Sequence, residues 1–411
     1  MSAGTDSSVV PNTPGRLSSA HCRSKLSAAG GLATSRTAGT DARNSRCSDE
    51  RTIKVTSTPR SEILVRNRAV AVNPVDWMKP YVGDLLFTWI KYPFVLGSDL
   101  AGEVAAVGGA VTDIRVGDRV LAMAAGACKQ RARAAEGAFQ AHTIVSRRLT
   151  TVIPDHLSYV EAAVVPLGLT TAACGLFQSD LLALERPSAH TGARDQWVII
   201  WGGSTSVGSN AIQLAVAAGY GVVTTASPKN FEYVRTLGAA HAFDYNSRDV
   251  VRDIIAALRG KHVVGALSIG AGSTAPCMEI LAQCQGRKFV ASCSAPVSFQ
   301  DMIKGSRITF AVFVDMLGAM LSSSASTWAK SRRLGVASRF FDASSVVDND
   351  IGRYIYQEYL GPALASGNFR PAPPPQVVGT SLHDIQTAFD IQRSGVSAAK
   401  IVVALAYTKS R

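Results

Sequence analysis

The sequence lacks paired cysteines. Its seven cysteines, at positions 22, 47, 128, 174, 277, 284 and 293, include no C-x-x-C spacing. This excludes a zinc ribbon and a disulfide framework as the basis of the fold, and reduced thiols predict a cytoplasmic protein. A long apolar run is also missing, because the most apolar window, 310–321, is short and is interrupted by Asp315. We therefore expect no membrane-spanning segment.

Acidic residues are scarce relative to basic ones. The formal net charge is +12, and residues 1–52 contribute seven Lys or Arg against four Asp or Glu. Such a surplus suits an anionic cofactor or substrate, whereas no dense basic run with interleaved aromatics indicates a nucleic-acid partner. The first forty residues contain a single acid, Asp6, as mitochondrial transit peptides do, but no amphipathic arginine face accompanies it. Residues 1–52 have little periodic apolar signal and are predicted to form a disordered tail.

The most informative stretch runs from Trp197 to Gly219. An apolar run, 197–201, is followed by the glycine turn GGSTSVG at 202–208 and by apolar residues at helical spacing. Strand, glycine turn and helix open a dinucleotide-binding unit, in which the backbone approaches a pyrophosphate at the helix N-terminus. A strict G-x-G-x-x-G pattern that ends at Gly208 would have its middle glycine at Thr205. A plain strand, turn and helix of an α/β domain is the alternative interpretation.

The remaining chain divides into a β-rich part and a part in which strands alternate with helices. Short segments with Gly and Gly-Asp punctuation over 53–166 predict a small β-barrel-like domain, and 129–136 reads as a charged surface loop. Helical periodicity begins at Ser158, with Glu161 completing a capping box. Strands at 197–201, 221–226, 240–243, 263–269 and 287–293 alternate with helices, which predicts a doubly wound parallel sheet. Residues 314–340 are Ser/Ala-rich and are predicted to be irregular, and a last strand covers 400–404.

Several blocks in this order resemble one family. NPVDW (73–77), LGSDLAGEV (96–104), VGDRV (116–120), PLGLTTAA (166–173), LGAAHAFDY (237–245) and SGVSAAKIVV (394–403) are similar to the medium-chain dehydrogenase/reductase superfamily. Within it, the chain resembles fungal CipB-like and ToxD-like proteins and trans-acting enoyl reductases. The resemblance implies an α/β chain with a GroES-like β-barrel catalytic domain built from both chain ends around a Rossmann domain. It places the first catalytic part at 53–166, the Rossmann domain at 167–343 and the return at 344–411.

The resemblance also bears on metal binding. Zinc alcohol dehydrogenases of the superfamily use two cysteines and a histidine, at positions that match Asn73, Ser98 and about Leu167 here. An amide, a hydroxyl and an alkyl group do not form a zinc site, and only Cys128 lies where a four-cysteine structural lobe would be. We therefore predict no metal.

The cofactor is predicted from the second strand of the Rossmann unit. An acid at its end would bind the ribose 2′-OH of NAD, but the chain continues Ser227-Pro228-Lys229-Asn230. A hydroxyl and an ammonium suit the 2′-phosphate of NADP(H). The resemblance further implies cofactor contacts at both ends of the cleft. The implied residues are Asn73, Pro74, Val75, Asp76, Thr170, Thr171, Ser204, Thr205, Ser206, Val207, Tyr245, Ile269, Gly270, Val396 and Ser397.

The predicted function is an NADPH-dependent, zinc-independent oxidoreductase that reduces an activated C=C bond of an enone, quinone or enoyl thioester. A role in fungal secondary metabolism, with a polyketide synthase acyl carrier as partner, is part of this expectation. The alternatives are a zinc-type alcohol dehydrogenase-like protein and a non-catalytic NADPH-binding protein with an RNA-binding role. For Asp76 a turn-capping role is preferred over chemistry, and Lys79, Tyr81 and water stay open as proton donors. The oligomeric state is open between a monomer and a homodimer.

Overall fold

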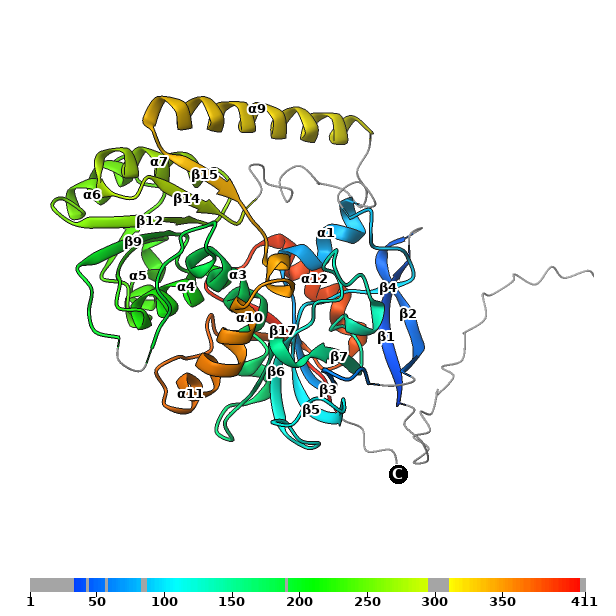
Figure 1. Cartoon of the computed structure of the whole chain (residues 1–411). Coiled ribbons are helices and arrows are strands. Elements are labelled where there is room, and N and C mark those ends of the chain that lie inside the picture. The colour runs from blue at the N-terminus through cyan, green and yellow to red at the C-terminus, as the bar shows by residue number, and fades with distance from the viewer. Residues whose placement is uncertain are drawn as a thin grey trace, which may run out of the picture.

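The computed structural model describes residues 33–41, 44–55, 58–82, 87–188, 191–294 and 310–406. Two large sheets organise this part of the chain, and Figure 1 shows them side by side with a long helix, α9, lying across the top. One sheet is formed by the middle of the chain. The other combines strands from the first and the last parts of the chain.

The middle of the chain forms a parallel sheet with the strand order β11-β10-β9-β12-β14-β15. Buried β-branched and aromatic residues make these strands, and helices connect them, as expected for a doubly wound fold. The sheet strands are β9 (Gln196–Trp201), β10 (Gly221–Ala226), β11 (His241–Asp244), β12 (His262–Ser268), β14 (Phe289–Ser292) and β15 (Ala337–Phe340), and β13 (Gln285–Gly286) pairs with β12 off this path. The connecting helices are α4 (Ser206–Ala217), α5 (Phe231–Thr236), α6 (Val250–Ala257), α7 (Thr274–Gln283) and α9 (Phe310–Leu334). The predicted parallel sheet is therefore confirmed.

The second large sheet has the order β16-β17-β3-β5-β6-β8, with β7 paired to β3. Its strands are β3 (Glu62–Ala71), β5 (Asp99–Val107), β6 (Arg119–Met123), β7 (His142–Ser146), β8 (Thr150–Val152), β16 (Pro375–Gly379) and β17 (Lys400–Ala404). Because β17 pairs antiparallel with β3, the last strand of the chain completes a sheet that begins more than three hundred residues earlier. This confirms that both chain ends build one domain.

The remaining helices lie between the two sheets or beside the second one. They are α1 (Pro74–Val82), α2 (Tyr159–Ala162), α3 (Pro166–Phe177), α10 (Ile351–Arg353), the π-helical turn η6 (Tyr354–Tyr359), α11 (Leu360–Ala365) and α12 (Ile385–Ser394). Ser158 and Glu161 form the predicted capping box of α2. The stretch Tyr159–Phe177 is long and apolar enough to cross a membrane by length and composition, but 83% of it is buried inside the structure, as in a core helix.

Three predictions of local structure are wrong. Strands β1 (Ala33–Asp41) and β2 (Asn44–Val55) pair with each other and with β4 (Phe94–Val95), where a disordered tail was predicted to reach residue 52. Backbone hydrogen bonds of a hairpin do not need the apolar periodicity that the prediction relied on. The rest of the predicted tail, residues 1–32, lies outside the described residues.

The other two corrections concern helices. Residues 314–340, predicted to be irregular, form most of α9 and then β15, because Ala, Leu and Met favour a helix even without a clear periodic pattern. Residues 73–77, predicted as a turn, begin α1, since proline is well tolerated at the first position of a helix.

Candidate functional site

The glycine turn after β9 is shaped by close backbone contacts. Gly202 has a φ of 88°, which favours glycine. A Cβ at Gly203 would lie 2.2 Å from Thr224 Oγ1, and one at Gly208 would lie 2.2 Å from the carbonyl of Gly202. Thr205 fills the position of the missing middle glycine, where it is the N-cap of α4. Its hydroxyl donates to the Gly202 carbonyl at 2.7 Å and accepts from the Gly208 amide at 3.0 Å. The departure from the strict motif therefore serves as a helix cap.

The N-terminus of α4 offers donors for an anion. The first amides of a helix have no intrahelical carbonyl, so those of Ser206 and Val207 are placed as in dinucleotide-binding folds. Ser206 Oγ is buried and has no hydrogen-bond partner within the described residues. Ser204 precedes the cap and is half-buried. This turn fits a dinucleotide phosphate, since it combines close backbone approach with free donors.

The end of β10 presents the predicted 2′-phosphate contacts. Ser227 is the N-cap of a short 3-10 turn, and Pro228 and Lys229 are exposed. Asn230 is buried, and its Nδ2 donates to Ser397 Oγ at 3.0 Å. The structure therefore brings together two predicted site residues, one from the middle and one from the last part of the chain.

Four other predicted residues lie at the surface or at the sheet edge. Tyr245 is 46% exposed, and Val396 is 37% exposed in the segment that carries Ser397. Ile269 follows β12 and lies against the glycine turn, because a Cβ at Gly202 would be 2.9 Å from its carbonyl oxygen. Gly270 has a φ of 102°, and its amide donates to Ser294 Oγ at 2.6 Å. The carboxyl edge of the parallel sheet, where dinucleotides bind, thus gathers the predicted loops.

A buried ionic cluster occupies the corner that matches the metal site of the zinc enzymes. Lys400 Nζ on β17 lies 2.8 Å from Asp99 Oδ2 on β5, and these side chains are 4% and 0% exposed. Asn73 joins both, since its Nδ2 donates to Asp99 Oδ2 at 2.8 Å and its Oδ1 accepts from Lys400 Nζ. The amide of Leu167 donates to Asp99 Oδ1 at 2.6 Å. Every polar atom of the Asn73 amide and the Asp99 carboxylate is therefore engaged.

Asp76 extends this cluster. Its Oδ2 accepts from the backbone amide of Asn73 at 2.7 Å, which caps the start of α1 as the sequence predicted. Burial raises the pKa of the Asp76 carboxyl to about 7, and the neighbouring Asp99 adds to the shift. Pro74 and Val75, which lie between Asn73 and Asp76 in the sequence, are exposed. The predicted stretch 73–76 thus presents Pro74 and Val75 outward, while the polar side chains of Asn73 and Asp76 are directed into the protein.

Helix α3 links the cluster to the glycine turn. Its residue Leu167 donates to Asp99, and the next residue, Gly168, is so close to α4 that a Cβ there would lie 2.4 Å from Ser206 Oγ. Thr170 Oγ1 lies 2.8 Å from the hydroxyl of Tyr356, and Thr171 Oγ1 donates to the Leu167 carbonyl at 2.8 Å. Both threonine hydroxyls, predicted at the nicotinamide end, are used within the protein.

Lys79 and Tyr81, the side chains considered as proton donors, both form hydrogen bonds within the protein. Lys79 is 1% exposed, and its Nζ donates to the Phe87 carbonyl at 3.0 Å. Tyr81 is 8% exposed, and its hydroxyl donates to Asp390 Oδ1 at 3.4 Å. Both side chains are therefore part of the core around α1 and α12.

The donor set does not fit zinc. Asn73, Ser98 and Leu167 do not provide soft or charged ligands, and the Lys400 ammonium carries a positive charge into the same corner. Across the described ranges, no three His, Cys, Asp or Glu side chains are grouped so that they could hold a metal ion. Sequence reasoning missed Lys400, although a lysine inside an apolar strand is a recognisable signal because buried lysines are rare.

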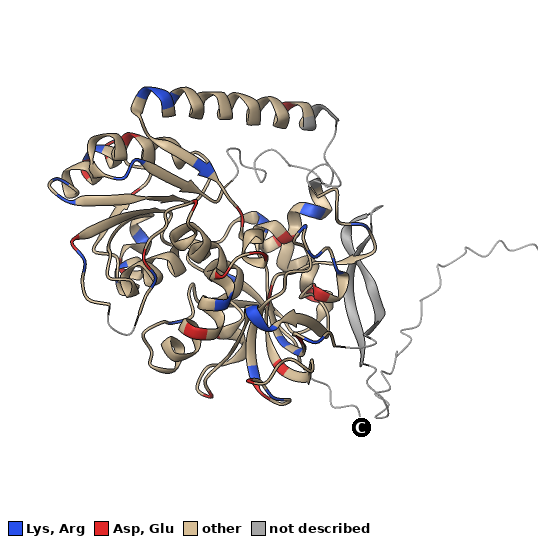
Figure 2. Ribbon diagram, in the orientation of Figure 1, with Lys and Arg blue, Asp and Glu red and all other residues tan. Residues whose placement is uncertain are grey.

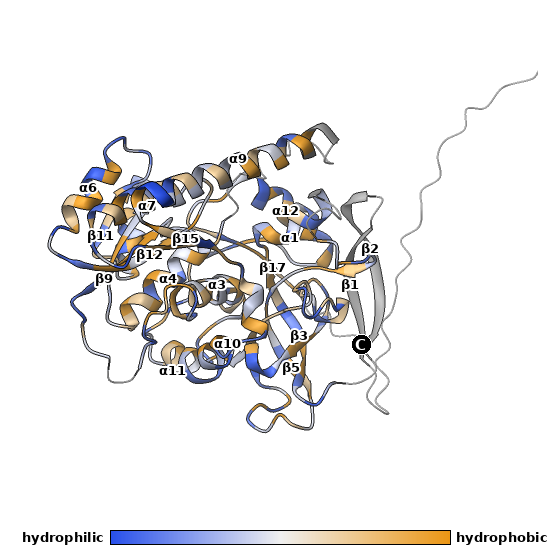
Figure 3. Cartoon of the chain, turned by 45° about the horizontal axis from the view of Figure 1, so that its top comes forward, coloured by the Kyte–Doolittle hydropathy of each residue, from blue (hydrophilic) through white to orange (hydrophobic). Residues whose placement is uncertain are grey.

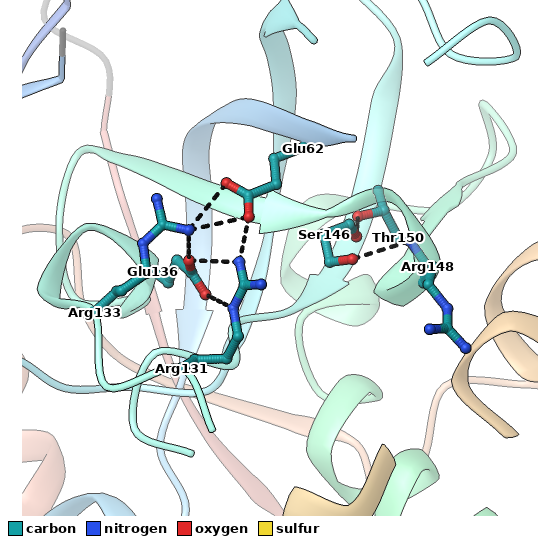
Figure 4. Close-up of polar contacts among 7 residues, drawn as sticks. All are labelled: Glu62, Arg131, Arg133, Glu136, Ser146, Arg148 and Thr150. Carbon is teal, nitrogen blue, oxygen red and sulfur yellow. Dashed lines mark hydrogen bonds and ion pairs between the residues drawn. The ribbon is translucent and has the colours of Figure 1, made fainter. Parts of the chain in front are cut away.

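An ionic quartet stabilises the loop where zinc enzymes carry a structural lobe. Glu62 and Glu136 are 5% and 2% exposed and lie between Arg131 and Arg133 (Figure 4). Arg131 binds Glu136 through Nε at 2.8 Å and Nη2 at 2.7 Å, and it also reaches Glu62. Arg133 binds Glu62 at 3.1 Å. The loop was predicted to be charged and superficial, but its last residue is buried because two arginines neutralise it. Nearby, the Arg148 amide donates to Ser146 Oγ, and Thr150 Oγ1 donates to the Ser146 carbonyl.

Comparison with known proteins agrees with this architecture. The model of the alcohol dehydrogenase GroES-like domain matches residues 59–155, and that of the zinc-binding dehydrogenase matches 206–304. The chain is similar to dehydrogenase pigH of Monascus ruber, with 51% identity over 84% of this chain and 92% of that protein. It is 34% identical to trans-enoyl reductase himH of Aspergillus japonicus, over 83% and 89% of the two chains.

A solved structure supports the fold. The CurK enoyl reductase superposes with a TM-score of 0.62 at 20% identity and covers 87% of this chain and 95% of that one. The strand order, the domain built from both chain ends and these relatives all point to one family. The chain belongs to the medium-chain dehydrogenase/reductase superfamily, with a GroES-like domain and a Rossmann domain, and its relatives include fungal dehydrogenases and trans-enoyl reductases.

Proposed function

We propose that this chain is an NADPH-dependent reductase of an activated C=C bond that works without zinc. The observation that carries the proposal is the ionic cluster of Lys400, Asp99 and Asn73 in the corner matching the metal site. A buried ammonium at this place disfavours a dication, because like charges repel strongly in a low-dielectric interior. A conjugated C=C bond needs less external polarisation than an isolated carbonyl or alcohol. The substrate class we favour is therefore an enone, quinone or enoyl thioester.

Cofactor binding is assigned to the glycine turn and to the loop after β10. The amides of Ser206 and Val207 would hold the pyrophosphate, and Ser227 and Lys229 would hold the 2′-phosphate. Exposure of Lys229 lets its ammonium reach a phosphate without losing another partner in the core. When bound, NADPH supplies a hydride.

The protein's own residues position the two halves of the cleft. Asp99 accepts from the Leu167 amide and so fixes the start of α3, whose Gly168 packs against the N-terminus of α4. The Asn230 to Ser397 hydrogen bond fixes the returning C-terminal segment against the cofactor loop. We infer that these two contacts orient the domain built from both chain ends relative to the cofactor-binding turn and loop, as hydride transfer by proximity requires.

The relatives support a proposal about the biological setting. The names of himH and pigH describe a trans-enoyl reductase of Aspergillus japonicus and a dehydrogenase of Monascus ruber. We propose a role in fungal secondary metabolism, with an enoyl thioester on the acyl carrier of a polyketide synthase as substrate.

Steady-state assays with NADPH test the enzymatic part of the proposal. The purified chain is titrated with NADPH and NADH, and oxidation is then followed with a panel of enones, quinones and enoyl thioesters. We expect turnover of at least one conjugated acceptor with NADPH. Tight NADPH binding without turnover across the panel would favour a non-catalytic binding protein, and stoichiometric zinc by metal analysis would revive an alcohol dehydrogenase-like activity.

A single variant tests cofactor choice. Lys229→Met should weaken NADPH binding by roughly 5- to 30-fold, the loss expected for one charge-assisted contact, and leave NADH binding unchanged. Lys129→Met, at another exposed lysine, is the matched control and should change neither constant. Equal loss for both cofactors would refute the assignment of Lys229 to the 2′-phosphate.

A further inference from the structure

Tyr356 is a buried tyrosine in the returning C-terminal part of the chain. It lies in η6, whose π-helical backbone is rare and is found frequently at functional sites. The rings of Tyr354 and Tyr359 in the same turn are stacked, with centroids 6.4 Å apart. In an α-helix, positions five residues apart would point about 140° away from each other, so this stacking depends on the π-helical turn. Thr151 Oγ1 on β8 donates to the Tyr356 carbonyl at 2.6 Å and so holds the turn against the second sheet.

The hydroxyl of Tyr356 contacts the first turn of α3. It donates to the Pro166 carbonyl at 2.9 Å, and it lies 2.8 Å from Thr170 Oγ1. Because a phenol has a single proton, the Thr170 hydroxyl supplies the proton of the second hydrogen bond. Burial raises the pKa of the Tyr356 hydroxyl above its ordinary value, so the hydroxyl stays protonated at neutral pH. The hydrogen bonds therefore run in one direction, from Thr170 through Tyr356 to Pro166.

The first turn of α3 is also held from two other sides. Asp99 on β5 accepts from the Leu167 amide at 2.6 Å, and α4 is so close that a Cβ at Gly168 would lie 2.4 Å from Ser206 Oγ. Figure 3 shows α3 beside α4 and α10. The helix, PLGLTTAACGLF, contains no charged residue, in agreement with its colour in Figure 2. Apolar packing is non-directional, so the hydrogen bonds of the first turn determine how the helix is rotated.

This turn of α3 joins the two parts of the proposed active site. Leu167 links it to the ionic cluster, and Gly168 links it to the cofactor-binding turn. Thr171, which the sequence predicts at the nicotinamide end, is 8% exposed and follows Thr170 directly. A small rotation of the turn would therefore change the position of Thr171 relative to a bound nicotinamide. A misplacement of about 1 Å can lower a reaction rate about 100-fold.

We propose that Tyr356 is a positioning residue that holds the first turn of α3 in the orientation needed for hydride transfer. This inference rests on the proposed function, reduction of a conjugated acceptor by NADPH. Tyr356 is 2% exposed, and both hydrogen bonds of its hydroxyl are made to α3. It therefore acts through Thr170 and the Pro166 carbonyl, and its substitution should change the geometry of the bound nicotinamide rather than the affinity for the cofactor phosphates.

Two tyrosine variants of the full chain test the proposal by kinetics. Tyr356→Phe removes the hydroxyl and keeps the ring. The matched control is Tyr359→Phe in the same turn, because the buried Tyr359 hydroxyl has no hydrogen-bond partner within the described residues. We expect kcat of Tyr356→Phe to fall about 10- to 100-fold, whereas its NADPH dissociation constant should change less than about 2-fold, since other elements contact the phosphates. Tyr359→Phe should match the wild type in both values.

Two further readouts need no turnover. The fluorescence of bound NADPH should be lower in Tyr356→Phe, because a less firmly held nicotinamide loses its excited state more readily. Hydrogen exchange of the free protein should be at least about 10-fold faster for the amides of 167–171 in Tyr356→Phe, because the first turn of α3 would open more often. Tyr359→Phe should again behave as the wild type in both measurements.

A second variant covers the case in which Tyr356→Phe does not fold. Thr170→Val removes the donor to the Tyr356 hydroxyl and keeps a side chain of similar shape. It should lower kcat by about 3- to 10-fold, the effect of one lost hydrogen bond, without weakening NADPH binding.

A loss of stability alone would leave kcat, NADPH fluorescence and exchange at 167–171 unchanged, and that result would overturn the proposal. So would equal effects of Tyr356→Phe and Tyr359→Phe. A wild type that binds NADPH and reduces no acceptor would refute the proposed function instead, and the fluorescence and exchange comparisons would then decide the role of Tyr356.

Discussion

The buried pair of Lys400 and Asp99 gives the sharpest test of how the catalytic domain is held together. Its ammonium and carboxylate are almost fully buried and 2.8 Å apart. Replacing one partner of such a pair leaves the other charge uncompensated, which usually costs about 3–5 kcal/mol. Lys400→Met would also leave Asn73 Oδ1 without its donor. Asp99 would keep its two hydrogen bonds from Asn73 and Leu167. We therefore expect Lys400→Met to lower the free energy of unfolding by about 3 kcal/mol, the lower end of that range.

A double-mutant cycle separates the ion pair from the loss of packing. Asp99→Asn removes the charge but leaves a side chain that can still form hydrogen bonds. The double variant with Lys400→Met then contains no uncompensated charge. We expect it to be more stable than the sum of the single changes predicts, with a coupling energy of about 2 kcal/mol.

Urea unfolding followed by tryptophan fluorescence measures these values at pH 7. Lys129→Met, at an exposed lysine, serves as a control and should change the free energy of unfolding by less than about 0.5 kcal/mol. A loss below about 1 kcal/mol for Lys400→Met, or a coupling energy near zero, would refute the view that this pair replaces a metal as the link between the two chain ends.

Three further outcomes are expected. The pKa of Asp76 is about 7 in the folded chain against 3.8 in the unfolded chain, so the folded form binds the proton more tightly and stability should fall as pH rises from about 4 to 7. Asp76→Asn should remove that fall, and thermal unfolding between pH 5 and 8 would show it as a flatter profile. Gly208→Ala should weaken NADPH binding at least about 10-fold by calorimetry, because its Cβ would meet the Gly202 carbonyl, whereas Gly109→Ala, with open space around it, should not. Glu136→Gln should lower the free energy of unfolding by about 2–3 kcal/mol in urea titration, because it leaves two arginines facing one carboxylate. Each expectation would be contradicted by a variant that behaves like the wild type. The contradicting results are an unchanged pH profile for Asp76→Asn, an unchanged NADPH affinity for Gly208→Ala and an unchanged free energy of unfolding for Glu136→Gln.

The sheet of the Rossmann domain could be predicted from the sequence because its strands are buried on both faces. The run 197–201 consists entirely of β-branched and aromatic residues, and its short length and polar flanks favour a buried strand over a helix. Helix α9 could not be predicted in the same way. Its apolar residues occur on two faces, Met316 inward and Leu321 outward, so the periodic signal of one buried face is weakened.

The candidate site was predictable in its backbone and not in its side-chain partners. Glycine spacing follows from contacts within one turn, which are local in sequence. Lys400, the partner that Asn73 and Asp99 share, lies on a strand that follows them by about three hundred residues, and no periodicity reports such pairing. For the same reason the pairing of the Thr170 hydroxyl with Tyr356, 186 residues later, could not be foreseen, whereas the hydroxyl of Thr171 bonds the carbonyl of Leu167 within its own helix.

The ionic cluster also gives a physical reason why the three ligand positions of the alcohol dehydrogenase pattern, which match Asn73, Ser98 and about Leu167, can be replaced together. A zinc ion at this corner would neutralise nearby carboxylates and join the segments that bind it. Lys400 supplies one positive charge to Asp99 and links β17, β5 and the start of α1 through hydrogen bonds. In the zinc-free enzyme proposed above, this cluster would keep the mechanical link between the two chain ends without a metal. What the exchange removes is an open coordination position for a substrate oxygen, because an ammonium saturated by Asp99 and Asn73 cannot polarise one as a Lewis acid does. This difference favours substrates that are already conjugated.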